Sequence, residues 1–357
     1  MQGAGVDLPS LHTARYAYFG DERKEQYMYG MLQYLHNAHF RETHLKDKNK
    51  LENLCVHLLG NREIKLNPIL GKVSKQIFEL IFSPKFTPMG DEEKEALQKS
   101  ILDIYNGKST LIISNHDTFA NLPMIIHKYL QLAKEMGISN FNQNIYTILG
   151  PLLTMHKTQK KIITAQGNTL VTIPAGTEQP ALKSVYSRER AISGEKMRSL
   201  LRDPNDQGRG AILLCCPSGT RDVIYRRPDG KPVIFLPDDY QSSNRVTFQT
   251  LVAPFRSNDH VNMLMIGSNT TAMKENKPAN NNQWNRGSEI ELHVCDLKEK
   301  QMNTTKDMIN LLTDQVQFHG ESIAIALPKD VFDILKKKSK KREICEEDLS
   351  ELNIDVG

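Results

Sequence analysis

The sequence predicts an α/β protein, with a mixed, mostly parallel sheet flanked by helices and preceded by a small helical N-terminal domain. From Lys108 onward, short apolar runs alternate with longer segments of helical spacing, and most intervals between the runs are long enough for a crossover helix. Before Lys108 the apolar residues recur at helical spacing. The chain has 357 residues, which is enough for one large domain and an accessory one.

The composition is that of an ordinary folded protein, with 39% hydrophobic and 25% charged residues. No apolar window approaches the roughly eighteen residues that a membrane-spanning helix needs. The first residues also lack the basic and apolar regions of a secretory signal. The five cysteines are scattered and include no CxxC pair, which predicts reduced thiols in a cytosolic compartment.

We expect four regions along the chain. Residues 1–20 form an N-terminal arm, 21–107 the helical domain, 108–330 the α/β domain and 331–357 a basic and then acidic tail.

The helical domain is expected from three apolar stripes and one further helix. That helix opens at Asp91, where acidic side chains suit the positive end of the helix dipole, and runs to about Gly107. The stripes are Met28, Met31, Leu32 and Leu35; Leu51, Leu54, Cys55, Leu58 and Leu59; and Val73, Ile77, Leu80 and Ile81. The histidines of this region fit no metal-binding spacing, and no metal site is expected.

The α/β domain is expected to alternate strands with helices. Strands are predicted at about 109–115, 145–149, 169–174, 210–216, 262–267 and 289–295. Helices are predicted at about 118–135, 178–202, 243–256 and 303–318. Pro123 is compatible with the first turn of the first of these helices, where a missing N–H costs nothing.

Two stretches of this domain, 111–123 and 210–222, follow one plan. Each is an apolar strand that runs into a polar loop, and parallel strands deliver such loops to the carboxyl edge of a sheet, where open α/β folds place their sites. The first loop carries His116, which could act as a general base. The second carries Arg221, which could bind an anion. We therefore expect a base and an anion-binding group in one pocket.

These two stretches resemble blocks of a known family. The motif Ser114-Asn115-His116 before a helix, followed by Cys216-Pro217-Ser218-Gly219-Thr220-Arg221-Asp222, is similar to the soluble plastid type of glycerol-3-phosphate acyltransferase, within the lysophosphatidate acyltransferase superfamily. The resemblance spans roughly residues 70–270. It implies a small helical domain before an α/β domain.

The resemblance also implies a reaction. His116 would take a proton from the acceptor hydroxyl as it attacks the acyl thioester of coenzyme A or acyl carrier protein. Ser218, Gly219, Thr220 and Arg221 would bind the acceptor, a glycerol-3-phosphate, lysophospholipid or related polar molecule. Neither a metal nor another cofactor is implied, because the acyl thioester is a co-substrate.

The chain departs from the family pattern at several positions. Asn121 stands where the family has an aspartate, and its amide carries no charge to stabilise an imidazolium. In serine proteases a comparable Asp-to-Asn change costs about four orders of magnitude in turnover. Thr220 replaces the second glycine of the later block and Val223 its second arginine. A lysine–histidine pair of the family falls near residues 175–177, where this chain has neither.

Other interpretations remain open for these residues. His116 and Asn121 could serve as helix caps, Ser218 could be a turn residue, and Arg221 could pair with a nearby aspartate. The chain could then be a degenerate relative that binds lipid without turnover. It could also be a hydrolase that uses Ser114 or Ser218 with His116, although no Gly-x-Ser-x-Gly motif surrounds either serine.

The expected tail is basic over 336–342 and acidic over 343–351. The basic run could be a solvated surface, or could contact the headgroups of an anionic membrane, which we favour over nucleic acid as a partner. The acidic block resembles the glutamate-rich ends of bacterial effectors secreted by type IV systems. The sequence thus predicts a cytoplasmic or peripheral membrane protein, with delivery into a host cell as a further hypothesis.

Overall fold

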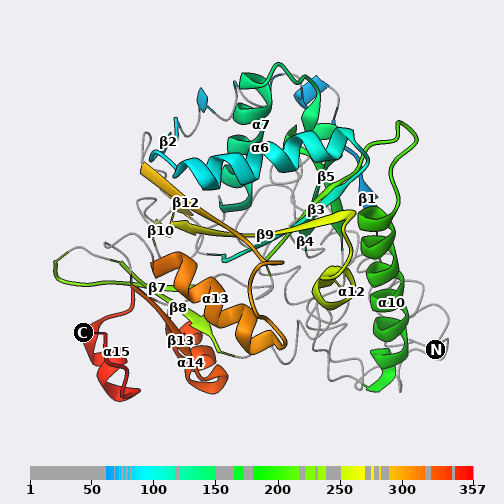
Figure 1. Ribbon diagram of the computed structural model, residues 1–357. Coiled ribbons are helices and arrows are strands. Elements are labelled where there is room, and N and C mark those ends of the chain that lie inside the picture. The colour runs from blue at the N-terminus through cyan, green and yellow to red at the C-terminus, as the bar shows by residue number, and fades with distance from the viewer. Residues whose placement is uncertain are drawn as a thin grey trace, which may run out of the picture.

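The computed structural model of the protein describes residues 62–67, 69–71, 73, 76, 79–80, 83–116, 121–149, 165–171, 180–216, 222–229, 232–238, 251–269, 275–276, 281–282, 289–317, 323–339 and 342–356. The predicted arm 1–20 and the first two helical stripes lie outside these residues. Figure 1 shows the arrangement of the elements.

The main sheet has eight strands in the order β1-β5-β4-β6-β3-β9-β12-β2. Their bounds are Arg62–Ile64 (β1), Lys85–Phe86 (β2), Ser109–Ser114 (β3), Ile145–Leu149 (β4), Asn168–Val171 (β5), Ile212–Cys215 (β6), Val261–Asn269 (β9) and Glu289–Asp296 (β12). The five strands from β5 to β9 run parallel, whereas β1 and β12 are antiparallel to their inner neighbours and β2 is parallel to β12. The predicted mixed, mostly parallel sheet is confirmed.

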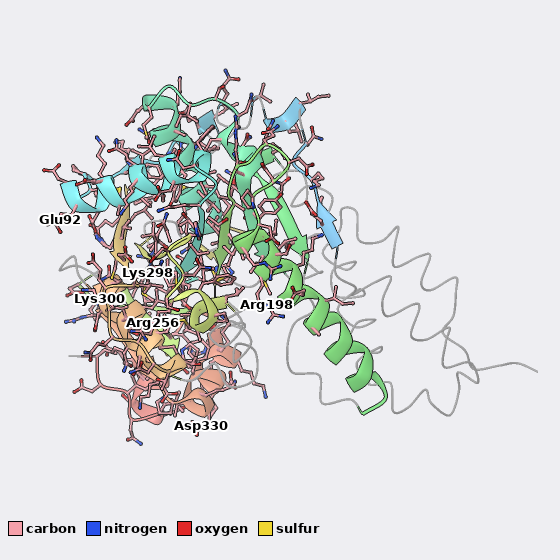
Figure 2. All side chains as sticks on the ribbon, turned by 45° about the vertical axis from the view of Figure 1, so that its right-hand side comes forward. Glu92, Arg198, Arg256, Lys298, Lys300 and Asp330 are labelled. Atoms are coloured by element: carbon pink, nitrogen blue, oxygen red, sulfur yellow. The ribbon has the colours of Figure 1, made fainter. Side chains whose placement is uncertain are left out.

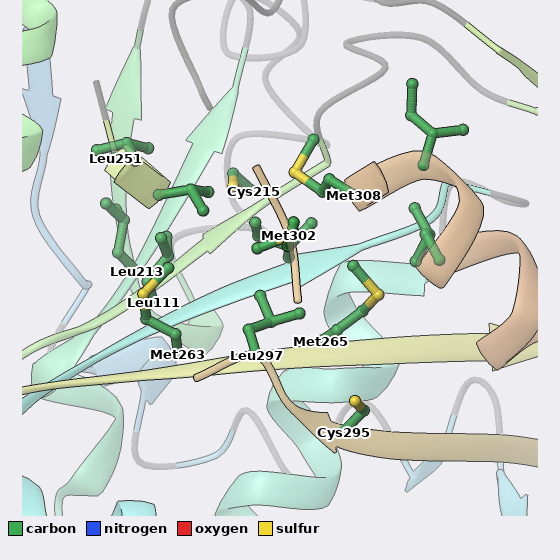
Figure 3. Close-up of a cluster of buried hydrophobic side chains, with 14 of the residues drawn as sticks. Leu111, Leu213, Cys215, Leu251, Met263, Met265, Cys295, Leu297, Met302 and Met308 are labelled. Carbon is green, nitrogen blue, oxygen red and sulfur yellow. The ribbon is translucent and has the colours of Figure 1, made fainter. Parts of the chain in front are cut away.

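Helices cover both faces of this sheet (Figure 1). The helices α6 (Asp91–Tyr105) and α7 (Asn121–Glu135) bury one face together with Ile112 of β3. The helices α10 (Pro180–Arg202), α12 (Ala253–Phe255) and α13 (Thr305–Gln317) bury the other. Figure 3 shows part of this second core, including Leu111, Leu213, Met263 and Met308. Because successive side chains of a strand point to opposite faces, a strand covered on both sides is apolar at consecutive positions, as β3 is from Leu111 to Ile113.

The helix α6 belongs to the α/β unit and not to a separate N-terminal domain. Its residues Leu97, Ile101 and Ile104 are buried in the core beneath α7. Its first turn is also tied to the sheet, because Glu93 Oε2 accepts from Gly90 N–H at 2.9 Å while Oε1 accepts from Val294 N–H at 3.1 Å. The strands β1 and β2 also join the main sheet, so the α/β unit includes described residues on the N-terminal side of Lys108.

A second sheet was not foreseen from the sequence. Its three strands lie in the order β13-β8-β7, with bounds Ile323–Leu327 (β13), Pro232–Pro237 (β8) and Val223–Arg226 (β7). The helices α14 (Lys329–Ser339) and α15 (Glu346–Glu351) follow, and Phe332, Leu335 and Leu349 share a core with β7 and β8. The described residues of 331–357 thus belong largely to a folded unit, in which α14 buries its apolar face against β7 and β8.

The basic and acidic parts of this segment bind each other. Asp348 is 1% exposed, and Arg342 donates to its two carboxylate oxygens at 2.6 and 2.8 Å. Lys338 lies 2.9 Å from the same carboxylate and also pairs with Glu351. Burial by itself would raise the pKa of Asp348, but the hydrogen bonds from Arg342 and Lys338 outweigh it and hold that pKa well below its usual range. The acidic block is thus partly neutralised within the fold.

The 3₁₀ helix η1 (Phe141–Asn144) leads into β4, and the strands β10 (Glu275–Asn276) and β11 (Asn281–Asn282) form a two-stranded pair. Among the described residues, no helix combines the length and the apolar character needed to cross a bilayer.

Candidate functional site

His116 lies at the carboxyl edge of the parallel strands, where the sequence predicts a site. The strand β3 is central, with β6 on one side and β9 on the other, and it ends at Ser114, two residues before the histidine. His116 is partly exposed, whereas Ser114 and Asn115 are buried. The side chain therefore stands at the border between the core and the sheet edge.

The two motif stretches meet at this edge. His116 N–H donates to Asp222 Oδ2 at 2.9 Å, and Asp222 N–H donates to the carbonyl oxygen of His116 at 2.7 Å. Asp222 is 6% exposed and follows Arg221 in the chain. A further contact joins the same loops, because the Cys216 thiol donates to the carbonyl oxygen of Asn115 at 3.3 Å. The loop after β6 is thus attached beside His116 at both of its described ends.

A buried polar network underlies the histidine. Asn115 Nδ2 donates to the carbonyl oxygen of Ser268 at 2.9 Å, and Asn115 Oδ1 accepts from Ser268 N–H at 2.8 Å and from Ser268 Oγ at 3.3 Å. Asn121 Nδ2 donates to Ser268 Oγ, and Asn121 Oδ1 accepts from Ser114 Oγ at 3.4 Å. These four residues are each at most 1% exposed. The network joins the ends of β3 and β9 to the start of α7.

Asn121 is the first residue of α7 and is fully buried. It stands where the resemblance expects the acid partner of the imidazole, but the hydrogen bonds described for its amide go to Ser114 and Ser268. Those bonds use the amide as both donor and acceptor. A carboxylate could replace the acceptor function and not the donor function.

Of the other predicted site residues, Ser218, Gly219, Thr220 and Arg221 lie outside the described residues. The neighbouring cysteines differ in their surroundings. Cys215 points into the core, where burial raises the pKa of its thiol to about 12, and Cys216 is only partly buried. Cys215 is therefore an inert core residue at neutral pH.

Sequence reasoning missed two residues of this edge. Ser268 is the penultimate residue of β9 and lies one residue beyond the predicted limit of 267, and a polar residue there could have indicated a position at the carboxyl edge. From the sequence, Asp222 is only one of the aspartates with which Arg221 could pair. No local pattern indicates that its carboxylate accepts from an amide 106 positions away in the sequence.

A cleft of about 940 Å³ lies away from His116. It is lined by the first turns of α6, by Asn262 and Leu264 of β9, and by the end of β12 with Glu299 and Lys300. Figure 2 labels two of its lining residues, Glu92 and Lys300. Asn262 is six residues before Ser268 along β9, which corresponds to about 20 Å of strand. This cleft is therefore not the pocket expected at the carboxyl edge.

Among the described residues, no group of three or more His, Cys, Asp or Glu side chains is arranged to hold a metal ion. Compared with models of known protein families, the chain matches none. It matches no curated protein either.

Proposed function

We propose that this protein transfers a fatty acyl group from acyl-CoA or acyl carrier protein to glycerol-3-phosphate, a lysophospholipid or a related polar acceptor. The observation that carries the proposal is the pair of hydrogen bonds between His116 and Asp222, at 2.9 and 2.7 Å. These two bonds join the loop that contains His116, the candidate base, to the loop that contains Arg221. Both loops follow parallel strands at the carboxyl edge of the sheet, the usual place of sites in open α/β folds.

The proposed chemistry needs one base and one anion-binding group. His116 accepts the proton of the acceptor hydroxyl while the hydroxyl oxygen bonds to the acyl carbon. The carbon–sulfur bond of the thioester then breaks, and the proton passes from the imidazole to the departing thiolate. Arg221 binds the phosphate of the acceptor, for which a guanidinium is well suited. Ser218, Gly219 and Thr220 would supply further contacts to the same group.

A second candidate function is lipid binding without turnover. The observation that favours it is the engagement of Asn121, whose amide bonds to Ser114 and Ser268 and carries no charge to stabilise an imidazolium. A serine hydrolase is less well supported. Ser114 is fully buried and donates its hydroxyl to Asn121, so it is poorly placed for nucleophilic attack.

Peripheral membrane contact is also part of the proposal. On α14, Lys337 is exposed and Ile334 is 46% exposed, and residues three apart lie on one face of a helix. An apolar side chain beside a lysine suits the border between headgroups and acyl chains of an anionic membrane. Delivery into a host cell by a type IV system would require recognition of an acidic block that is partly engaged by Lys338 and Arg342.

The test is a transfer assay with labelled palmitoyl-CoA and either glycerol-3-phosphate or lysophosphatidate as acceptor. We expect acceptor-dependent formation of the acylated product, reduced by at least about 100-fold in His116→Ala, as for the loss of a general base. His260→Ala is the matched control, because His260 is exposed and precedes β9 at the opposite end of the strand.

The other candidates give different results in the same experiment. Tight retention of palmitoyl-CoA or lysophosphatidate without product would support the lipid-binding function. Release of free palmitate without transfer would support a hydrolase. Transfer that is equal in His116→Ala and the control would contradict the role given to His116.

A further inference from the structure

We infer that Asp222 is a positioning residue, which fixes the main chain of His116 and thereby the direction of its imidazole. Two hydrogen bonds form what we call the bridge: His116 N–H donates to Asp222 Oδ2 at 2.9 Å, and Asp222 N–H donates to the His116 carbonyl oxygen at 2.7 Å. The inference rests on the proposed function, because it explains why the imidazole of His116 must have a fixed direction. The bridge itself can be measured without any substrate.

One residue thus binds both main-chain polar groups of His116. Regular strand pairing does not provide these bonds, because β3 ends at Ser114 and β7 begins at Val223. A carboxylate takes the place of a main-chain carbonyl as the acceptor, and such charge-assisted hydrogen bonds are stronger than neutral ones. With 6% of its surface exposed, Asp222 has exchanged most of its hydration for such contacts.

The preceding residue is held equally firmly. The side chain of Asn115 bonds to Ser268 of β9, and its carbonyl oxygen accepts from the Cys216 thiol. The turn at 115–116 is therefore anchored by β9 on one side and by the loop after β6 on the other. A side chain attached to so constrained a main chain has few directions available. Such pre-organisation is what a general base requires.

A purely structural role is the alternative. Asp222 immediately precedes β7, so the same bridge also attaches the three-stranded sheet to the end of β3. The two roles differ in what the removal of the carboxylate changes. If Asp222 positions His116, the surroundings of the imidazole change as well as the stability of the junction.

The test compares Asp222→Ala, which removes the acceptor, with Asp222→Asn, whose amide oxygen can still accept from His116 N–H. Hydrogen exchange of the His116 amide reports the bridge. Carbethoxylation of histidines by diethyl pyrocarbonate, measured for each peptide by mass spectrometry, reports the imidazole, with His260 as an internal control. Asp348→Ala is the matched variant, because it removes another buried aspartate from the C-terminal helices.

We expect Asp222→Ala to lose protection of the His116 amide and to carbethoxylate His116 faster, with His260 unchanged. Asp222→Asn should retain most of the wild-type behaviour. In the transfer assay, kcat should fall about tenfold or more in Asp222→Ala with little change in KM, since small misplacements of a catalytic group are costly. Asp348→Ala should lower the melting temperature without changing the reactivity of His116.

Two results would overturn the inference. In the first, Asp222→Ala loses the hydrogen-exchange protection of the His116 amide but carbethoxylates His116 at the wild-type rate. The bridge would then have a structural role only. In the second, the His116 amide in Asp222→Ala stays as protected as in the wild-type protein, which would show that His116 N–H does not donate to Asp222. If Asp222→Ala does not fold, Asp222→Ser, which also removes the carboxylate, is measured in its place. Absence of transfer in the wild-type protein would refute the proposed function alone, because the exchange and labelling measurements do not depend on it.

Discussion

Asn115 and Ser268 are joined by three hydrogen bonds, and in two of them the side-chain amide of Asn115 takes the place of a strand neighbour. Asn115 Oδ1 accepts from the main-chain N–H of Ser268 at 2.8 Å, and Asn115 Nδ2 donates to its carbonyl oxygen at 2.9 Å. The pairing of β3 with β9 is thereby extended beyond Ser114, the last residue of β3. This extension holds the main chain at the point where His116 leaves the sheet.

Replacing Asn115 should destabilise the whole unit. Asn115→Ala removes all three bonds and leaves the main-chain N–H and carbonyl of Ser268 buried without the amide partners. We expect the free energy of unfolding to fall by roughly 2–4 kcal/mol, mainly from the two lost main-chain bonds and the desolvation of the groups left behind. Urea denaturation measures the change. Asn303→Ala is a suitable control, because Asn303 is exposed, and an equal effect in the two variants would contradict the role given to Asn115.

The substitution Asn121→Asp restores the acid of the family pattern but places it in a network built for an amide. The hydrogen bond that Asn121 Nδ2 donates to Ser268 Oγ is lost. A carboxylate is then buried at this position, and none of the described hydrogen bonds of Asn121 comes from a cation. We expect a loss of about 2 kcal/mol or more in the free energy of unfolding at pH 7, with no gain in transfer. Denaturation and the transfer assay measure the two effects. A faster enzyme of unchanged stability would instead indicate that the amide is a decayed catalytic group.

The ion pairs of Asp348 predict a specific loss of stability in acid. Its pKa is held well below the unfolded value of about 3.9, because the hydrogen bonds from Arg342 and Lys338 outweigh the effect of burial. A carboxyl whose pKa is lowered by folding contributes stability above its unfolded pKa and loses it as the pH falls toward the folded pKa. Between pH 5 and pH 3, the wild-type protein should therefore lose more of its free energy of unfolding than Asp348→Asn. Denaturation midpoints across this range test it, and parallel curves for the two proteins would contradict it.

Much of the main sheet could be predicted from the sequence, and the reason is visible in β3. Leu111 and Ile113 contact one core while Ile112 contacts the other, so the strand is apolar at successive positions and stands out from its surroundings. The C-terminal unit could not be predicted in the same way. In α14 the apolar Phe332 and Leu335 are followed by three consecutive lysines, so charge obscured the amphipathic pattern of the helix.

The candidate site was only partly predictable. The position of His116 at the carboxyl edge follows from the strand that precedes it. The roles of Asp222 and Ser268 depend on contacts between segments that no local pattern relates. The hydrogen bonds of Asn121 could not be predicted either, because an amide at the start of a helix looks the same in sequence whether it caps the helix or bonds to a distant strand.

The hydrogen bonds around His116 also bear on how the protein reaches its final form. They join residues separated by 106 positions, for Asp222, and by 153 positions, for Ser268. During synthesis from the N-terminus, a chain that has been made only as far as the end of β6 contains His116. It still lacks Asp222 and Ser268, which form the hydrogen bonds around the histidine. Contacts between such distant segments carry a loop-closure cost and are slow to form. The turn that carries His116 should therefore acquire its fixed shape only after β9 has joined the sheet.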